Sequence, residues 1–128
     1  MDQEQPIRIV IVDDQAVVRS GLEAMTLVND DLELVGQAGS GEAAVEMCRQ
    51  LQPDVALIDL IMPGMDGVSA IRGIRAASPR TQIIALSFSL PEDQLVQQAL
   101  QAGAAEYLMK NIWADELANA IRKAVRKD

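Results

Sequence analysis

Asp54-Val-Ala-Leu-Ile-Asp59-Leu-Ile-Met-Pro63-Gly64-Met-Asp-Gly67 begins as a buried strand and ends as a turn. The four residues before Asp59 are apolar, which is typical of a strand covered on both faces of a parallel sheet. Pro63, Gly64 and Gly67 follow closely and predict a sharp turn. A carboxylate at the end of a buried strand destabilises the fold unless it is paired, bound to a metal or used in chemistry. We therefore expect Asp59 to mark the functional site.

Strand and helix patterns alternate on both sides of this stretch. β-branched or alternating runs predict further strands at residues 7–12, 32–38, 82–87 and 105–109. Apolar residues at helical spacing follow each strand, and the last predicted helix starts near Trp113, which we expect to pack inward. Leu100 is expected on the inner face of the fourth helix. The chain therefore predicts one α/β domain over residues 1–128, doubly wound, with a parallel five-stranded sheet.

Composition excludes several classes of function. The 128 residues carry a formal net charge of −8, which argues against direct nucleic-acid contact because such surfaces are basic. No apolar run is long enough for a membrane span, and a single cysteine, Cys48, suits the cytoplasm. One Trp, one Tyr and one Phe give no stacking surface for flavins or bases.

Chemically useful side chains stand where the predicted strands end. Asp13 and Asp14 follow the first strand, Asp59 the third, Ser87 the fourth and Lys110 the fifth. Ligands of open α/β sheets bind outside the carboxyl ends of the strands, so these groups should converge. An all-oxygen cluster favours Mg²⁺ or Mn²⁺, and a carboxylate beside such an ion and a lysine is suited to attack a phosphoryl group.

The same residues carry a resemblance to a known family. Ile-Arg-Ile-Val-Ile-Val-Asp-Asp at residues 7–14, the quoted stretch at 54–67, and Gly-Ala-Ala-Glu-Tyr-Leu-Met-Lys at 103–110 resemble response regulator receiver domains, CheY-like proteins of bacterial two-component systems. The NarL/FixJ (LuxR-type) branch is most similar, and the similarity covers nearly the whole chain. It implies a (βα)5 flavodoxin-like fold with strand order 2-1-3-4-5.

The resemblance also implies a role for each site residue. Asp59 would be the phosphoacceptor, and Lys110 would contact the phosphoryl group. Asp13, Asp14, Asp59 and the backbone carbonyl of Ile61 would bind the metal.

Ser87 and Tyr107 would form a switch pair, in which the hydroxyl moves toward the phosphoryl group and the ring turns inward.

A sensor histidine kinase would be the phosphoryl donor. Phosphorylation would favour a homodimer through the first and last helices or through the fourth-helix face. The chain would be the isolated receiver of a longer, cytoplasmic regulator with a C-terminal helix-turn-helix domain that binds DNA.

Two alternatives stay open. A degenerate receiver would act only as a protein-binding module, although the complete acidic set argues against it. An aspartate-nucleophile phosphohydrolase would need a second acid two residues after Asp59, where the chain has Ile61. The chain also departs from the branch at Gln15-Ala16, where His-Pro is common, and at Ser87-Phe88-Ser89, where smaller residues are usual. These departures bear on switching speed more than on the phosphorylation chemistry.

Overall fold

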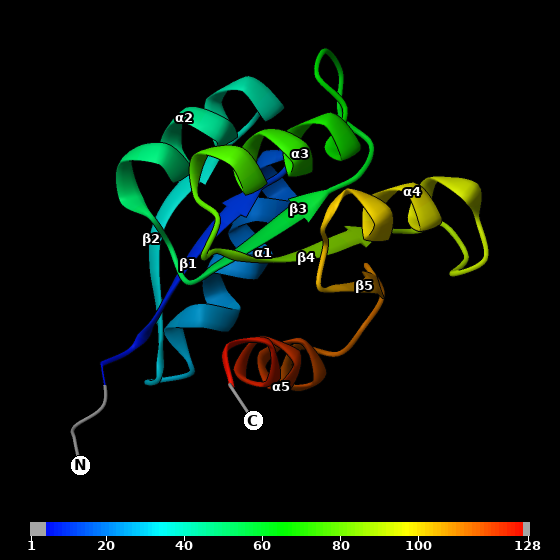
Figure 1. Cartoon of the computed structure of the whole chain (residues 1–128). Helices are drawn as coiled ribbons and strands as arrows, with labels where there is room; N and C mark the ends of the chain where they lie inside the picture. The colour runs from blue at the N-terminus through cyan, green and yellow to red at the C-terminus, as the bar shows by residue number, and fades with distance from the viewer. Residues whose placement is uncertain (1–4, 127–128) are drawn as a thin grey trace.

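Strands and helices alternate through residues 5–126, the part of the chain that the computed structural model describes (Figure 1). The strands are β1 (Ile7–Val12), β2 (Leu32–Ala38), β3 (Val55–Asp59), β4 (Gln82–Ser87) and β5 (Glu106–Met109). The helices are α1 (Ala16–Leu27), α2 (Gly41–Leu51), α3 (Gly67–Ala77), α4 (Gln94–Ala102) and α5 (Ala114–Val125). This alternation confirms the predicted α/β class.

The five strands form one parallel sheet in the order β2-β1-β3-β4-β5, as expected for the family. Asp59 on β3 pairs with Leu86 on β4, and Ser87 pairs with Met109 on β5. The carboxyl ends of β3, β4 and β5 are therefore level. Residues that follow these strands meet at one edge of the sheet.

Helices cover both faces of the sheet and enclose two separate cores (Figure 1). Ala56, Ile58 and other strand residues pack against α2, α3 and α4 on one face. Val55 and Leu57, which alternate with them along β3, pack against α1 and α5 on the other face. Because the strands supply side chains to both cores, β3 is buried along its whole length.

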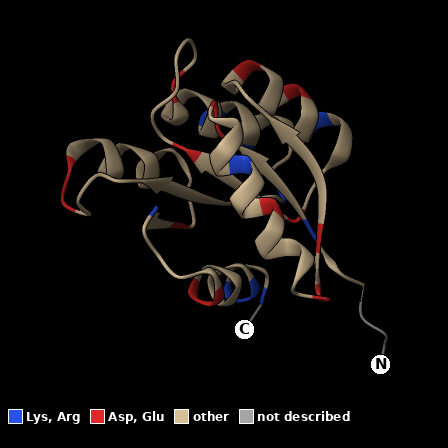
Figure 2. Ribbon diagram, turned by 180° about the vertical axis from the view of Figure 1, so that it is seen from behind, with Lys and Arg blue, Asp and Glu red and all other residues tan. Residues whose placement is uncertain are grey.

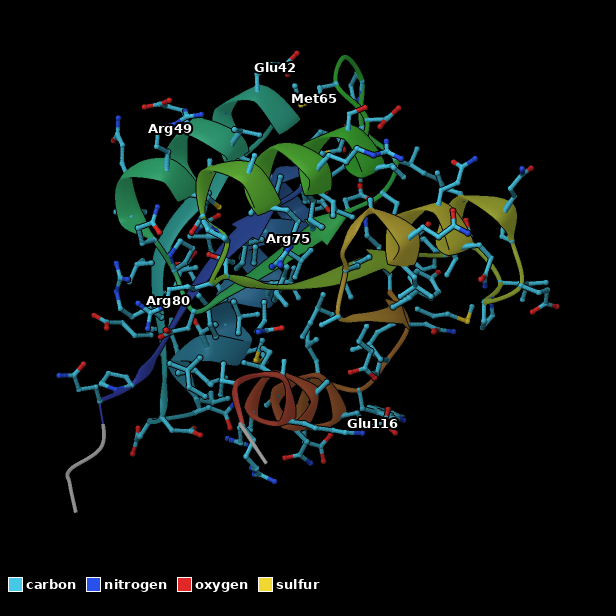
Figure 3. The ribbon with its side chains drawn as sticks, in the orientation of Figure 1. Glu42, Arg49, Met65, Arg75, Arg80 and Glu116 are labelled. Carbon is cyan, nitrogen blue, oxygen red and sulfur yellow. The ribbon has the colours of Figure 1, made fainter. Side chains whose placement is uncertain are left out.

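Capping side chains begin two of the helices, and a glycine ends a third. The Ser40 and Asp66 side chains accept the backbone N–H groups of Ala43 and Ser69 and so cap α2 and α3. Gly103 ends α4 with a φ of 122°, a conformation that favours glycine. Arg75 of α3, labelled in Figure 3, lies against Gly103 and donates to the carbonyl oxygens of Pro79 and Thr81.

Two predicted packing positions are wrong. Trp113 is 76% exposed because it precedes α5 as its N-cap and lies outside the buried face of that helix. Leu100 is 39% exposed, and Val96 and Ala99 provide the buried residues of α4 instead. Within residues 5–126, no helix has the length and apolar character needed to cross a bilayer.

Charge along α5 is segregated, as Figure 2 shows. Asp115 and Glu116 lie in the first turn, and Arg122 and Lys123 lie in the last turn. Each pair opposes the partial charge that the helix dipole places at its end, which stabilises the helix.

Candidate functional site

Three carboxylates gather at the carboxyl edge of the sheet. Asp13 follows β1 and is 1% exposed, Asp59 ends β3 and is 5% exposed, and Asp14 is exposed beside them. One oxygen atom from each of the three lies within 4.8 Å of the others. Carboxylates this close repel one another unless a positive charge joins them. Their spacing and all-oxygen character suit a hard divalent cation such as Mg²⁺.

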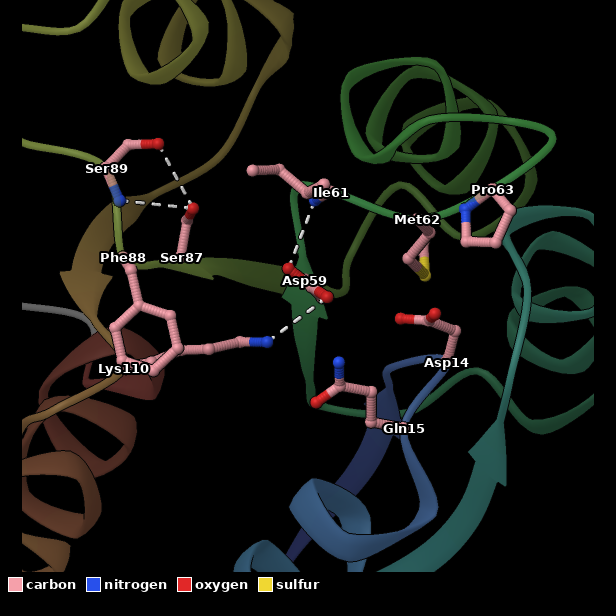
Figure 4. A pocket seen from close by; sticks show the side chains of 10 residues that line it. All are labelled: Asp14, Gln15, Asp59, Ile61, Met62, Pro63, Ser87, Phe88, Ser89 and Lys110. Carbon is pink, nitrogen blue, oxygen red and sulfur yellow. Dashed lines mark hydrogen bonds and ion pairs between the residues drawn. The ribbon is translucent and has the colours of Figure 1, made fainter.

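Lys110 supplies positive charge from the other side of the pocket. Its Nζ lies 2.8 Å from Oδ2 of Asp13 and 3.1 Å from Oδ2 of Asp59. Its backbone N–H donates to the carbonyl oxygen of Ser87, which continues the β4–β5 pairing and fixes the lysine at this edge. Figure 4 shows the Lys110 side chain extended toward Asp59. The sheet topology thus joins residues 97 positions apart in one ion pair.

Burial and pairing act in opposite directions on these groups. Burial raises the pKa of the Asp59 carboxyl, and the N–H of Ile61 and the charge of Lys110 offset this only in part. Burial alone would lower the pKa of Lys110, but the hydrogen bond to Asp13 and the charge of Asp59 raise it above its ordinary value. The ion pair therefore stabilises the protonated, charged form of Lys110. It does not fully offset the effect of burial, which disfavours the ionised form of Asp59.

Ser87 and Tyr107 lie on the β4–β5 side of the pocket. The Ser87 hydroxyl is buried, contacts the Ser89 hydroxyl at 3.2 Å and accepts the Ser89 N–H at 3.3 Å. The Tyr107 hydroxyl donates to the carbonyl oxygens of Ser87 and Ser89. The predicted switch pair is thus joined through the backbone that follows β4.

An open cavity of about 750 Å³ gives access to these groups. Ile61 and Phe88 line it and are 61% and 69% exposed, so they form an apolar part of its rim. The ring centroid of Phe88 lies 5.9 Å from Nζ of Lys110. The side chain of Ile61 occupies the place where a phosphohydrolase would need its second acid, and the metal-ligand role of its carbonyl stays a prediction.

The structure also adds contacts that the sequence did not predict. The backbone N–H of Gln15 donates to Oδ1 of Asp13 at 2.9 Å, and the Arg19 guanidinium donates to the Asp13 carbonyl oxygen. The sequence marks Ser89 only as a departure from the family pattern, because its contact with Ser87 depends on the turn after β4. The alternation of two serines around Phe88 is the signal that could have suggested it.

Known proteins share this fold and are similar in sequence. Residues 9–122 match the family described as response regulator receiver domain. The chain is 36% identical over 123 residues to the response regulator protein VraR of Staphylococcus saprophyticus, covering 96% of this chain and 58% of VraR.

The signal receiver domain of the putative response regulator NarL from Mycobacterium tuberculosis has a TM-score of 0.91 at 33% identity, covering 98% of this chain and 100% of that one. The receiver domain of the sensor histidine kinase PA1611 from Pseudomonas aeruginosa PAO1, solved with a magnesium ion coordinated in its active site cleft, has a TM-score of 0.82 at 30% identity, covering 94% and 98% of the two chains. The chain thus spans less than two thirds of the length of VraR.

Proposed function

Because the chain belongs to the response regulator receiver family, we propose that Asp59 accepts a phosphoryl group and acts as a reversible switch in two-component signalling. One observation carries the proposal: the buried Asp59 carboxylate lies in an open pocket, with Nζ of Lys110 3.1 Å away and two further carboxylates beside it. These are the groups needed to position and neutralise a transferred phosphoryl group.

In the proposed reaction, a carboxylate oxygen of Asp59 forms a bond to phosphorus. The bond from phosphorus to the donor atom breaks, and its electron pair leaves with the donor. Lys110 is placed to contact the equatorial phosphoryl oxygens. Ser87 lines the same cavity as Asp59 and would donate to one of these oxygens after its side chain rotates.

Asp13, Asp14 and Asp59 fit a divalent cation, and we assign Mg²⁺ or Mn²⁺ to them together with the carbonyl of Ile61. The observation behind this assignment is their three oxygen atoms within 4.8 Å of one another. The ion would supply positive charge that offsets the phosphoryl oxygens. The magnesium ion in the PA1611 receiver supports the assignment.

Acetyl phosphate with Mg²⁺ tests the phosphoacceptor. Intact mass should rise by about 80 Da, the mass of one covalent phosphoryl group, on the native chain. Asp59→Ala should not gain this mass. Asp66→Asn is the matched control, because Asp66 is an exposed cap seven residues away and asparagine also caps helices. A native chain that gains no mass would instead support a phosphorylation-independent binding module.

The proposed biological donor is a sensor histidine kinase, and the proposed setting is a cytoplasmic regulator with a DNA-binding output domain. The length of VraR relative to the matched region supports a longer parent protein. This chain itself is acidic, with a net charge of −8, so we assign no DNA contact to it.

Phosphorylation is also proposed to favour a homodimer, and the face formed by α1 and α5 is the better supported of the two candidates. A cavity of about 230 Å³ is lined in part by these helices. Val17 and Trp113, which are neighbours in sequence of the lining residues Val18 and Ala114, are 78% and 76% exposed. Sedimentation with Mg²⁺ and beryllofluoride should show a dimer that Val17→Asp abolishes. Leu100→Asp on α4 is the matched control for the other face. Dimerisation lost only in the Leu100 variant would select the α4 face, and a native monomer would refute the dimer.

A further inference from the structure

Ser89 contacts both members of the predicted switch pair. Its hydroxyl lies 3.2 Å from the Ser87 hydroxyl, and its backbone N–H donates to the same Ser87 oxygen at 3.3 Å. Its carbonyl oxygen accepts the Tyr107 hydroxyl, which also donates to the Ser87 carbonyl at 3.0 Å. Ser89 is half-buried and lines the same cavity as Asp59.

These contacts turn the Ser87 hydroxyl away from the acidic groups. Figure 4 shows the hydroxyl directed at Ser89, while the Asp59 carboxylate is directed at Lys110 and the N–H of Ile61. A phosphoryl group on Asp59 would enter the cavity that Asp59 and Ser87 both line. To reach it, the hydroxyl has to rotate and give up its contact with Ser89, whichever of the two hydroxyls donates.

We propose that the Ser89 hydroxyl is a positioning group that holds Ser87 in the unphosphorylated arrangement and sets how readily Ser87 turns toward the phosphoryl group. This inference rests on the proposed phosphorylation of Asp59. It assigns Ser89 no contact with the reacting atoms and no part in forming the new bond. Its effect falls on the equilibrium between the two orientations of the Ser87 hydroxyl.

In the unphosphorylated arrangement, the backbone around Ser87 is held by contacts that do not involve the Ser89 hydroxyl. Tyr107 holds both carbonyl oxygens, and Ser87 is paired with Met109 in the sheet. Ser89→Ala removes only the hydroxyl and leaves the N–H and carbonyl contacts of residue 89 in place. The variant therefore isolates a single hydrogen bond, which is equivalent to roughly fivefold in an equilibrium constant.

Beryllofluoride with Mg²⁺ provides the test on the whole chain. It binds reversibly as a phosphoryl mimic, so the equilibrium does not depend on how fast an acyl phosphate is hydrolysed. The readout is the beryllofluoride concentration that gives half of the change in the ¹H–¹⁵N shifts of the Ser87 and Tyr107 amides. Ser89→Ala should lower this midpoint by about fivefold, the equivalent of one neutral hydrogen bond. Ser89→Thr, which keeps the hydroxyl, should restore the native midpoint.

A Ser87→Ala background separates positioning from a general effect on the loop. In this background Ser89→Ala should no longer shift the midpoint, because no Ser87 hydroxyl is left to hold. An unchanged midpoint in the single variant, or an equal shift in both backgrounds, overturns the inference while the native response upholds the proposed function. A native chain that neither responds to beryllofluoride nor gains mass from acetyl phosphate overturns both.

Discussion

Asp59 is held in a site that disfavours its charge. The carboxylate is 5% exposed, a second carboxylate lies beside it, and Lys110 is shared between the two. Burial raises the pKa of Asp59, so the ionised form destabilises the fold at neutral pH relative to the unfolded chain. This destabilisation is fully present above the raised pKa. It declines as the pH falls below that pKa and is gone below the ordinary value of 3.8, where the carboxyl is protonated in both states.

We expect Asp59→Asn to raise the free energy of unfolding at pH 7 without divalent cations by about 1 kcal/mol, within the usual range of single stabilising changes. The amide keeps the shape of the carboxylate but removes the buried charge, and Lys110 retains Asp13 as a partner at 2.8 Å. Urea unfolding measures the difference. Asp66→Asn serves as the exposed control, with little change expected. An Asp59→Asn variant less stable than the native chain would contradict the prediction.

Magnesium should reverse that order of stability. At about one hundred times the dissociation constant, bound Mg²⁺ stabilises the native chain by about 2.7 kcal/mol through mass action. Asp59→Asn removes one ligand of the cluster and should show a much smaller gain. The rise in melting temperature with MgCl₂, compared with equal ionic strength of NaCl, measures this effect. Equal gains in the two proteins would place the cation elsewhere.

At the scale of elements, the junction between β3 and α3 is packed against the backbone. Gly67 begins α3, and a Cβ added there would lie 2.6 Å from the carbonyl oxygen of Asp59 and in contact with Leu60 Cα. Gly21 in α1 is the opposite case, because a Cβ there meets nothing within 4 Å. Gly67 is therefore required by the close approach of the β3 backbone, whereas nothing around Gly21 requires a glycine.

Substituting alanine at the two glycines should therefore give effects of opposite sign. Gly67→Ala should lower the free energy of unfolding by about 2 to 3 kcal/mol, since the backbone of β3 has to shift. Gly21→Ala should raise it by about 0.5 to 1 kcal/mol, because alanine restricts the unfolded chain and favours the helix. Chemical denaturation measures both, and a Gly67→Ala protein of native stability would be inconsistent with this packing.

Arg122 joins α5 to the turn between α1 and β2. Its Nε and Nη2 donate to the two oxygens of Asp31 at 2.6 and 2.9 Å, and Nη2 also donates to Oδ1 of Asn29. The hydrogen bond from Arg122 lowers the pKa of Asp31 below its ordinary value of 3.8. A lowered carboxyl pKa stabilises the fold above the ordinary value, and this stabilisation is lost as the pH falls through the lowered pKa.

Asp31→Asn should therefore reduce stability at pH 7 by about 0.5 kcal/mol, a small value because both side chains are partly exposed to solvent. The difference from the native chain should shrink as the pH falls below 3.8. Urea unfolding across this pH range measures it. Glu46→Gln breaks the more exposed Arg49–Glu46 pair on α2 and should show no resolved change. A difference that persists in acid would rule out this ion pair as its cause.

At the scale of the whole molecule, Cys48 reports on the opening of a core. The thiol lies on α2 with no exposed surface, and burial raises its pKa to about 11. A disulfide reagent at pH 8 should label it slowly in the folded chain. The labelling rate should rise with urea in parallel with global unfolding. Gln101→Cys on the exposed face of α4 is the control and should react at once, and fast labelling of native Cys48 would reveal local opening of α2 instead.

The hydrophobic pattern predicted the strands and helices, and the charged and polar residues that follow the strands predicted the site. The strands at 7–12, 32–38 and 82–87 begin and end where predicted. Residues 7–12 are rich in β-branched side chains, and residues 32–38 mix polar and apolar positions and stop at Gly39-Ser40-Gly41. The strand order came from family resemblance, and parallel topology then places the ends of β3, β4 and β5 side by side. Contacts such as Ser87 with Ser89, or Arg122 with Asp31, depend on rotamers and distances between elements, which no local pattern encodes. Trp113 was predicted inside because large apolar residues are usually buried, and its place before the first turn of α5 decided otherwise.

The two cores on opposite faces of the sheet have a consequence for divergence and redesign. Neighbouring positions of one strand, such as Ile83 and Ile84, belong to different cores, so each face has its own set of mutually fitting side chains. Substitutions that repack α1 and α5 can accumulate without compensating changes beneath α2, α3 and α4. Evolution or design can therefore change the residues that one face presents to a partner while the other face keeps its sequence. The carboxyl edge of the sheet, which holds Asp59 and borders both faces, has to stay unchanged.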